Sequence, residues 1–228
     1  MHGWTRPELL SVVGRGPARE RCLEVVGWVL DAADACREGS LAEQVRDRPF
    51  GFTAEGLGLA RGVALRSVDC DLRGHERVFF HVGLGMARAF GAELEWPQGP
   101  LRRLQADGLG FASALQRPGR ALRLTPPADA DPVWFVHGLG RACWFLSAGS
   151  PSSLPEILAE ARPGLIEGFG LASVFTGGVP GEVEQRLLRR VGPARAELEL
   201  GRCFARWLRG SEPAAPRGLY EAIGAEAA

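Results

Sequence analysis

The sequence contains no lysine, no asparagine and a single tyrosine, Tyr220. The missing lysine excludes a phosphate-loop nucleotide site, which needs that side chain on the phosphates, and pyridoxal chemistry, which needs it to form a Schiff base. The catalytic lysine of protein kinases and the serine-lysine group of penicillin-recognising enzymes are excluded for the same reason. Several large enzyme classes therefore do not fit this chain.

An excess of charge of either sign is also missing, because 27 basic residues balance 27 acidic ones. Such a balance does not favour binding to nucleic acid. No apolar run reaches the roughly 20 residues of a membrane-spanning helix, so we expect no membrane span. The five cysteines are odd in number and widely spaced, and we expect no secretory leader before them. We therefore expect reduced thiols, with neither disulfides nor structural zinc, in a cytoplasmic protein.

The sequence does contain a repeated phrase, in which two glycines flank one apolar residue. Its copies stand at 56–58, 83–85, 108–110, 138–140 and 168–170, with a degenerate copy at Leu200-Gly201. Counted at the second glycine, successive copies are 27, 25, 30, 30 and 31 residues apart. Such a period is typical of stacked helical hairpins, none of which can bury its apolar face alone. We expect an all-α protein of repeated helical hairpins of about 25–31 residues, stacked as an α-solenoid or a closed α/α ring.

Small residues fall on two opposite faces of each glycine-marked helix. At 100° per residue, the second glycine shares one face with the residue four places on, and the first glycine lies on the opposite face. A glycine inside a helix costs roughly 0.5–1 kcal/mol relative to alanine. We therefore expect neighbouring helices to press in from both sides, where the missing side chains let the backbones approach.

No linker-like stretch divides the chain, so we expect a single helical-repeat domain over residues 1–210. A loose C-terminal tail over residues 211–228 would then carry Tyr220. Residues 19–37 and 41–46 are expected to form the first helical hairpin. Gly27 stands 31 residues before Gly58 in this hairpin and is taken as a degenerate copy of the repeated phrase.

Local signals give the expected ends of other helices. Second helices are expected over residues 154–161 and from about 183 to 191, each stopped by glycine and proline. Asp131 is expected to cap the helix that begins at Pro132. Residues 69–77 are polar and are expected to form a loop. The runs 78–82 and 133–136 could also be short strands by composition, although both continue into the helical pattern.

Ionisable side chains recur at one position of the repeat. Immediately before the first glycine stand Glu55, Asp107, His137 and Glu167, and His81 lies one place earlier in its copy. Such groups in an apolar cavity suit proton transfer, because burial and mutual repulsion move their pKa values towards neutrality. They also suit an iron, manganese or zinc ion. The structural alternative is that each pairs with a helix dipole or with an arginine of the neighbouring repeat.

We take Glu55, Asp107, His137 and Glu167 as the candidate catalytic set, with no cofactor assigned. Arg141 follows a second glycine directly and either binds an anionic group of a ligand or pairs with an acidic neighbour. The candidate substrate-binding residues are His81, Arg141, Trp144 and Phe111. Cys143 is expected to be an inert small hydrophobe rather than a nucleophile.

Five blocks of the sequence resemble a bacterial family catalogued as domain of unknown function 1702. They are GFTAEGLGLARGVAL at 51–65, HVGLGMARAF at 81–90, ADGLGFA at 106–112, GLGRACWF at 138–145 and GFGLASVFTGG at 168–178. Their order and spacing match over roughly residues 20–205, with shortened loops around 118–127. The resemblance implies a cytoplasmic accessory or tailoring protein of enediyne-type polyketide biosynthesis.

On this resemblance we expect the partner to be a long, unsaturated, apolar polyketide-derived molecule, with other biosynthetic enzymes nearby. The molecule would occupy an internal pocket, and the ionisable set would lie at its wall. The rival hypothesis is a non-catalytic helical scaffold that holds partner enzymes on an extended surface. A cavity bordered by the ionisable set favours the first hypothesis, and a filled centre with those groups paired to arginines favours the second.

Overall fold

The computed structural model describes residues 5–46, 51–66, 68–160, 162–177, 179–212 and 214–227, without the side chains of Leu219, Glu226 and Ala227. Across these residues the chain is helical and contains no strand. The α-helices are α1 (Arg6–Ser11), α2 (Arg19–Asp34), α3 (Leu41–Arg46), α4 (Gly51–Ala60), α5 (Gly74–Ala89), α6 (Pro100–Gln116), α7 (Pro132–Ser147), α8 (Leu154–Ala159), α9 (Leu165–Thr176), α10 (Gly181–Arg190), α11 (Arg195–Leu208) and α12 (Glu221–Ala227). A π-helical turn, Arg61–Leu65, extends α4, and short 3₁₀ turns cover Pro118–Arg123, Pro151–Ser153, Gly192–Ala194 and Gly218–Tyr220.

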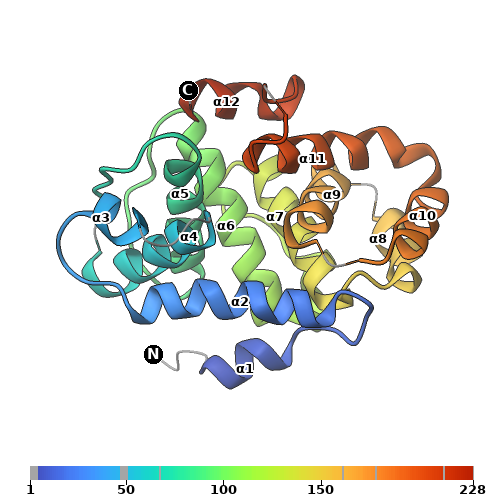
Figure 1. The fold of residues 1–228 in the computed structure, drawn as a ribbon, viewed down its shortest axis with the longest axis horizontal. Coiled ribbons are helices and arrows are strands. Elements are labelled where there is room, and N and C mark those ends of the chain that lie inside the picture. Colours follow the sequence, from blue (N-terminus) through green and yellow to red (C-terminus); the bar gives the residue numbers. More distant parts are fainter. Residues whose placement is uncertain are drawn as a thin grey trace.

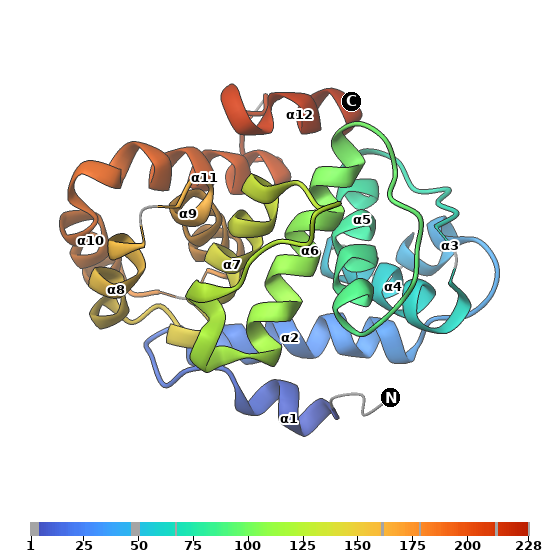
Figure 2. The same cartoon turned by 180° about the vertical axis from the view of Figure 1, so that it is seen from behind.

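The helices that carry the repeated phrase pack one against the next in chain order, as α4, α5, α6, α7, α9 and α11. The long helix α2 crosses one side of this row and α12 lies on the opposite side (Figure 1). The view from behind shows α6 and α7 in front, between α4–α5 and α9–α11 (Figure 2). The all-α prediction is confirmed for the described residues, and the choice between a solenoid and a ring stays a prediction.

The paired glycines lie where successive helices cross. A Cβ on the first glycine would collide with a carbonyl oxygen of the preceding helix, as at Gly83 against Glu55. A Cβ on the second glycine would collide with a carbonyl oxygen of the following helix, as at Gly85 against Gln105. The copies on α6, α7 and α9 repeat both contacts. The predicted close approach on both faces is therefore confirmed, and it brings Cα–H groups against carbonyl oxygens.

The predicted degenerate copy at Gly27 is wrong. A Cβ at Gly27 would meet only an Arg6 side-chain nitrogen at 3.9 Å, so no neighbouring backbone approaches there. The first glycine of α4, Gly56, instead faces the carbonyl oxygen of Val29. In the other copies, the carbonyl oxygen that faces a first glycine belongs to the preceding helix, three places before the second glycine of that helix. Counting three places on from Val29, the position on α2 that corresponds to a second glycine is Ala32. The repeat therefore continues back into α2, with alanine in place of glycine.

The structure also tests several predictions about individual helix ends, strands and loops. The Asp131 side chain caps α7 by accepting hydrogen bonds from the backbone N–H groups of Val133 and Trp134, each at 3.1 Å. The runs 78–82 and 133–136 are helical, so the strand alternative is wrong. The expected loop at 69–77 ends early, because α5 already begins at Gly74. The predicted second helices correspond to α8 and α10, although residue 161 lies outside the described residues.

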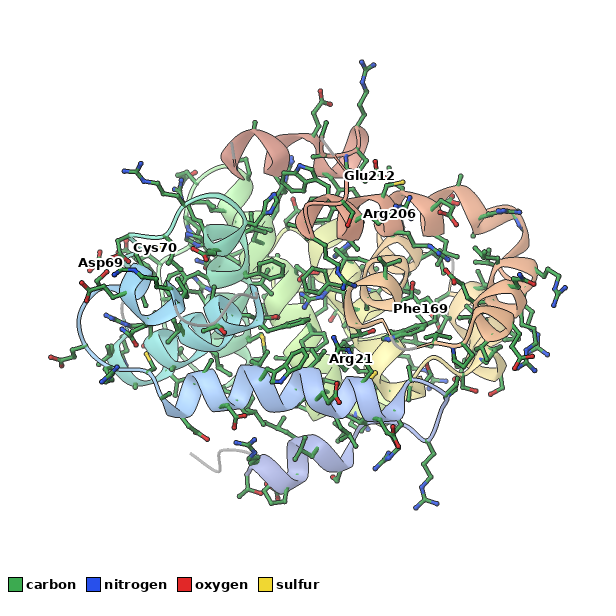
Figure 3. All side chains as sticks on the ribbon, viewed as in Figure 1. Arg21, Asp69, Cys70, Phe169, Arg206 and Glu212 are labelled. Atoms are coloured by element: carbon green, nitrogen blue, oxygen red, sulfur yellow. The ribbon has the colours of Figure 1, made fainter. Side chains whose placement is uncertain are left out.

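The expectation that Tyr220 lies in a loose tail is wrong. Tyr220 and Ile223 are fully buried, and α12 packs on α5 and α6. The Tyr220 ring stacks on Phe204 of α11 at a centroid distance of 4.1 Å. Arg206 and Glu212, labelled in Figure 3, form an ion pair at 3.1 Å at the point where the chain leaves α11. The buried side chains of Tyr220 and Ile223 thus hold this segment against the helices, despite the proline-rich composition that suggested a loose end.

Candidate functional site

Three predicted ionisable residues meet in the interior around one arginine. Glu55, Asp107 and His137 come from α4, α6 and α7, and none is more than 2% exposed. Arg141, one turn after His137 on α7, donates from Nη2 to Glu55 Oε1 at 3.0 Å and from Nη1 to Asp107 Oδ2. The guanidinium therefore joins two carboxylates from different helices, an arrangement that its planar fork of donors favours.

The other oxygen of Asp107 extends the hydrogen-bonded chain. His137 Nδ1 lies 2.6 Å from Asp107 Oδ1, and His137 Nε2 lies 2.9 Å from the hydroxyl of Tyr220. Five side chains thus form one buried chain in the order Glu55, Arg141, Asp107, His137 and Tyr220. We call this chain the buried network.

The repeat explains why these side chains come together. Glu55, Asp107 and His137 occupy the same place in their copies, so their Cα atoms lie at the same level where consecutive helices cross. The carbonyl oxygens of Glu55, Asp107 and His137 are the atoms that face the first glycine of the next helix. Arg141 stands four residues after His137, so both side chains project from the same face of α7.

The pKa shifts follow from burial and from pairing. Burial raises the pKa of Glu55, Arg141 opposes the rise, and the charge of Asp107 adds to it. Burial also acts to raise the pKa of Asp107, but the charge of Arg141 and the contact with His137 outweigh it and lower that pKa. The pKa of Arg141 is raised against the effect of its burial by both carboxylates. Asp107 is therefore the firmly charged partner of Arg141, and Glu55 is the carboxyl that takes up a proton more easily.

A narrow cavity of about 40 Å³ lies between α2 and the row and reaches the buried network. Its lining is apolar except for Glu55 and Arg141. The Phe111 ring forms part of this wall and holds the Arg141 guanidinium at 4.7 Å over its face. The cavity places a carboxyl and a guanidinium at the end of an apolar space, where a carboxyl can exchange protons. Its volume is below the roughly 300–1,000 Å³ of pockets that hold drug-sized ligands.

A family described as "Protein of unknown function (DUF1702)" matches residues 42–216 of this chain. The chain belongs to this family. No curated protein and no solved structure matches it. The matched range holds Glu55, Asp107, His137 and Arg141 of this DUF1702 protein, whereas Tyr220 lies beyond it. None of the helices described for the DUF1702 protein is long and apolar enough to cross a membrane.

Glu167 does not join the buried network of the DUF1702 protein. It is partly exposed and lines a separate surface hollow of about 700 Å³, whose walls come from α8 to α11 and the adjoining turns. Its charge acts on Tyr220, where it adds to the effect of burial in raising the pKa of the phenol. Three of the four predicted catalytic residues, Glu55, Asp107 and His137, therefore meet in the buried network, and Glu167 does not.

Two predicted substrate-binding residues have other partners. The Trp144 indole N–H donates to Thr176 Oγ1 at 2.8 Å, and Trp144 does not line the cavity beside Glu55. His81 Nδ1 lies 3.3 Å from the Gln105 side-chain nitrogen. Burial, followed by the positive charge of Arg77, lowers the pKa of His81 to about 4. Phe111 and Arg141 alone of this set reach the cavity.

Two other hypotheses can be compared with the geometry. No group of three or more His, Cys, Asp and Glu side chains that could hold a metal ion is found within the described part of the DUF1702 protein. The carboxylates face Arg141 instead, as the structural alternative expects. Burial, followed by the charge of Glu156, raises the pKa of the Cys143 thiol to about 12, which disfavours the thiolate that a nucleophile requires.

Sequence reasoning missed Tyr220, the terminal member of the network. Its position follows no copy of the repeat, and the residues before it are rich in proline and alanine. The signal that could have found it is its rarity, because it is the single tyrosine of the chain.

We expect the Tyr220 phenol to stay un-ionised until the protein unfolds. Burial, then the charges of Glu167 and Asp107, raise its pKa well above the ordinary value of 10.0. The folded protein therefore holds the phenol proton more tightly than the unfolded chain does. Ionisation of Tyr220 does not reduce the free energy of unfolding below about pH 10, and it reduces that free energy as the pH rises further. Alkaline titration of tyrosinate absorbance reports this residue alone. The change should coincide with the loss of helical circular dichroism, and an earlier, separate tyrosinate signal would contradict the buried position.

Proposed function

We propose that this DUF1702 protein is an accessory or tailoring protein of enediyne-type polyketide biosynthesis in the cytoplasm. It takes up a slender, unsaturated, apolar molecule at the cavity beneath α2, which widens from its volume of about 40 Å³ as the molecule enters, and Glu55 exchanges a proton with that molecule. The observation that carries the proposal is the apolar cavity whose ionisable wall consists of Glu55 and Arg141. The place in biosynthesis and the unsaturated polyketide ligand rest on the family resemblance, and the apolar character of the ligand is supported by the cavity lining.

The chemistry follows from the unequal carboxyls. A carboxyl whose pKa is raised by burial donates a proton to a polarised double bond and can later take one back. Arg141 keeps its charge throughout and stabilises the carboxylate left after donation. Both ends of the guanidinium already bind carboxylates, so the proposal no longer gives Arg141 the role of anchor for an anionic ligand.

We further propose that the row of helices is a closed α/α ring around the buried network. The Phe52 ring of α4 lies 4.9 Å from the Phe175 ring of α9, and His75 of α5 lies 4.4 Å from Trp207 of α11. These contacts support closure because they join helices from the beginning and the end of the row. A closed ring encloses the buried network, while the cavity beside it is completed by α1 and α2.

The ligand class is tested with diphenylhexatriene, a linear conjugated hydrocarbon that fluoresces in apolar surroundings. We expect saturable binding to the wild-type protein and binding at least tenfold weaker to Ala112→Leu, because Ala112 lines the cavity. Ala196→Leu adds the same bulk at an exposed position of α11 and should bind like the wild type. Equal binding by all three proteins would place the ligand elsewhere, and no saturable binding would contradict the proposal.

The role of Glu55 is tested with a linear dienone incubated in heavy water. We expect the wild-type protein to exchange hydrogens of the bound dienone for deuterium, because Glu55 moves protons to and from the polarised chain. Glu55→Gln should bind the dienone but exchange at least a hundredfold more slowly, as expected for loss of a general acid-base group. Mass spectrometry measures the exchange. Equal rates in both proteins would remove Glu55 from the reaction.

A non-catalytic scaffold is the second candidate, and the complete pairing of Arg141 favours it. The exposed apolar side chains of Val63, Leu65 and Val68 after α4, which are 47%, 41% and 41% exposed, offer a surface for partner enzymes. If the protein binds neither diphenylhexatriene nor the dienone, this alternative is preferred.

A further inference from the structure

The buried network joins two opposite sides of the molecule. Glu55 faces the cavity on the side of α2, whereas Tyr220 belongs to the turn that leads into α12 on the other side of the row (Figures 1 and 2). Tyr220 also lies beyond residues 42–216, which match the family. A segment outside the family match thus completes the hydrogen bonding of the residues inside it.

We infer that Tyr220 is a positioning residue for Glu55, and that its hydroxyl sets, through His137, Asp107 and Arg141, how strongly the cavity carboxyl holds its proton. The inference rests on the proposed function, in which Glu55 is the group that acts on the ligand. It adds a control on that group from a residue that does not touch the cavity.

The first step is the state of the imidazole. Asp107 Oδ1 lies 2.6 Å from His137 Nδ1 and, as a carboxylate oxygen, only accepts, so the neutral ring carries its hydrogen on Nδ1. Nε2 is then an acceptor, and the Tyr220 hydroxyl donates to it at 2.9 Å. The tyrosine therefore stabilises the tautomer that points a donor towards the carboxylate.

The second step is the competition for Arg141. Asp107 accepts from His137 at one oxygen and from Arg141 at the other, so it is held as an anion. Glu55 shares the same guanidinium and is repelled by the charge of Asp107. Any change that removes negative charge from Asp107 leaves Arg141 more strongly attached to Glu55.

The third step is the loss of the hydroxyl. In Tyr220→Phe, Nε2 would be a buried acceptor without its donor, so the ring with its hydrogen on Nδ1 loses a hydrogen bond that stabilises it. The Asp107–His137 pair then takes up a further proton more readily, which reduces the negative charge near Glu55. Glu55 holds its own proton less strongly as a result.

The surroundings of the network leave few other charges to consider. Glu55 is faced by Arg141 from α7 and Asp107 from α6, while α2 and α5 bring apolar residues to the same cavity. Tyr220 is faced by the charge of Glu167 from α9 as well as that of Asp107. Glu167 disfavours the phenolate, so it supports the donating hydroxyl that the inference requires.

The experiment is a carbon-13 NMR titration of glutamate side-chain carboxyls in the ligand-free protein, with Glu55 assigned by its loss in Glu55→Gln. We expect the proton affinity of Glu55 to fall about tenfold in Tyr220→Phe, as for one added charge near a buried pair. Ile223→Val is the matched control, because Ile223 is also fully buried on α12 and leaves the hydroxyl in place. Its Glu55 titration should match the wild type. An unchanged titration in Tyr220→Phe, or an equal shift in Ile223→Val, would overturn the inference.

A second measurement decides the matter if Tyr220→Phe does not fold. Because Tyr220 is the single tyrosine, growth on ortho-fluorinated tyrosine changes this side chain alone. The more acidic phenol donates a stronger hydrogen bond to His137, so the proton affinity of Glu55 should rise. No change or a fall would refute the inference. Neither titration uses a ligand, so failure of diphenylhexatriene binding would remove the proposed function and leave this result standing.

Discussion

Arg141→Met is expected to lower the free energy of unfolding by about 3–5 kcal/mol, because it leaves two buried carboxyl groups without their shared cation. Glu55 and Asp107 are each 2% exposed, so water cannot replace the guanidinium. Methionine keeps most of the side-chain volume and its contact with Phe111. The loss of stability should therefore come from removal of the positive charge and not from a packing defect. Urea unfolding followed by circular dichroism measures the change, and the dependence on urea concentration should stay the same.

The control for this variant is an exposed ion pair. Arg6 and Asp31 are 2.7 Å apart, with side chains 43% and 54% exposed, so Arg6→Met should cost less than about 1 kcal/mol. Adding Glu55→Gln and Asp107→Asn to Arg141→Met should restore most of the lost stability, because no buried charge is then left unpaired. Equal effects of Arg141→Met and Arg6→Met, or a triple variant no more stable than the single one, would contradict the buried pairing.

Gly138→Ala is expected to cost about 3 kcal/mol or more, although alanine is the better helix former. The added Cβ would collide with the carbonyl oxygen of Asp107 and lie 2.7 Å from the backbone nitrogen of Phe111. Both atoms belong to the backbone of α6, so they cannot move aside as a flexible side chain would. The helices must separate, and the contacts along α6 and α7 are lost with them.

Thermal and urea unfolding of Gly138→Ala measure this cost. Gly181→Ala is the matched control, because Gly181 begins α10 and a Cβ added there would meet nothing within 4 Å. That substitution should be neutral or stabilise the protein by up to about 1 kcal/mol, through lower entropy of the unfolded chain. If Gly138→Ala were as stable as Gly181→Ala, the helices would not be in backbone contact at this crossing.

The helical crossings could be predicted from the sequence because each one needs the same two glycines. Gly108 and Gly138 recur at a fixed place in successive copies, and the face on which each lies follows from the helical period. Ala32 shows the limit of this reasoning. Alanine is common in helices, so its use at a crossing cannot be recognised until Gly56 is seen against Val29.

The meeting of Glu55, Asp107 and His137 could be predicted for the same reason, but their partners could not. The period places the side chains at a common level without saying which arginine reaches them. Arg141 binds both carboxylates, whereas the equivalent residue on α9 is Leu171, and Glu167 there lines a surface hollow instead. Tyr220 lies outside the repeat, so no periodic argument could bring it to His137.

The crossings also determine how the network responds to a change in charge. The backbone at Glu55, Asp107 and His137 supplies the oxygen atoms that touch Gly83, Gly138 and Gly168, so these three Cα positions have almost no room to shift. Displacement of the backbone at these positions is thereby suppressed. A change of protonation at Asp107 or His137 is therefore passed to Glu55 as a change of charge across Arg141, which keeps its own protons.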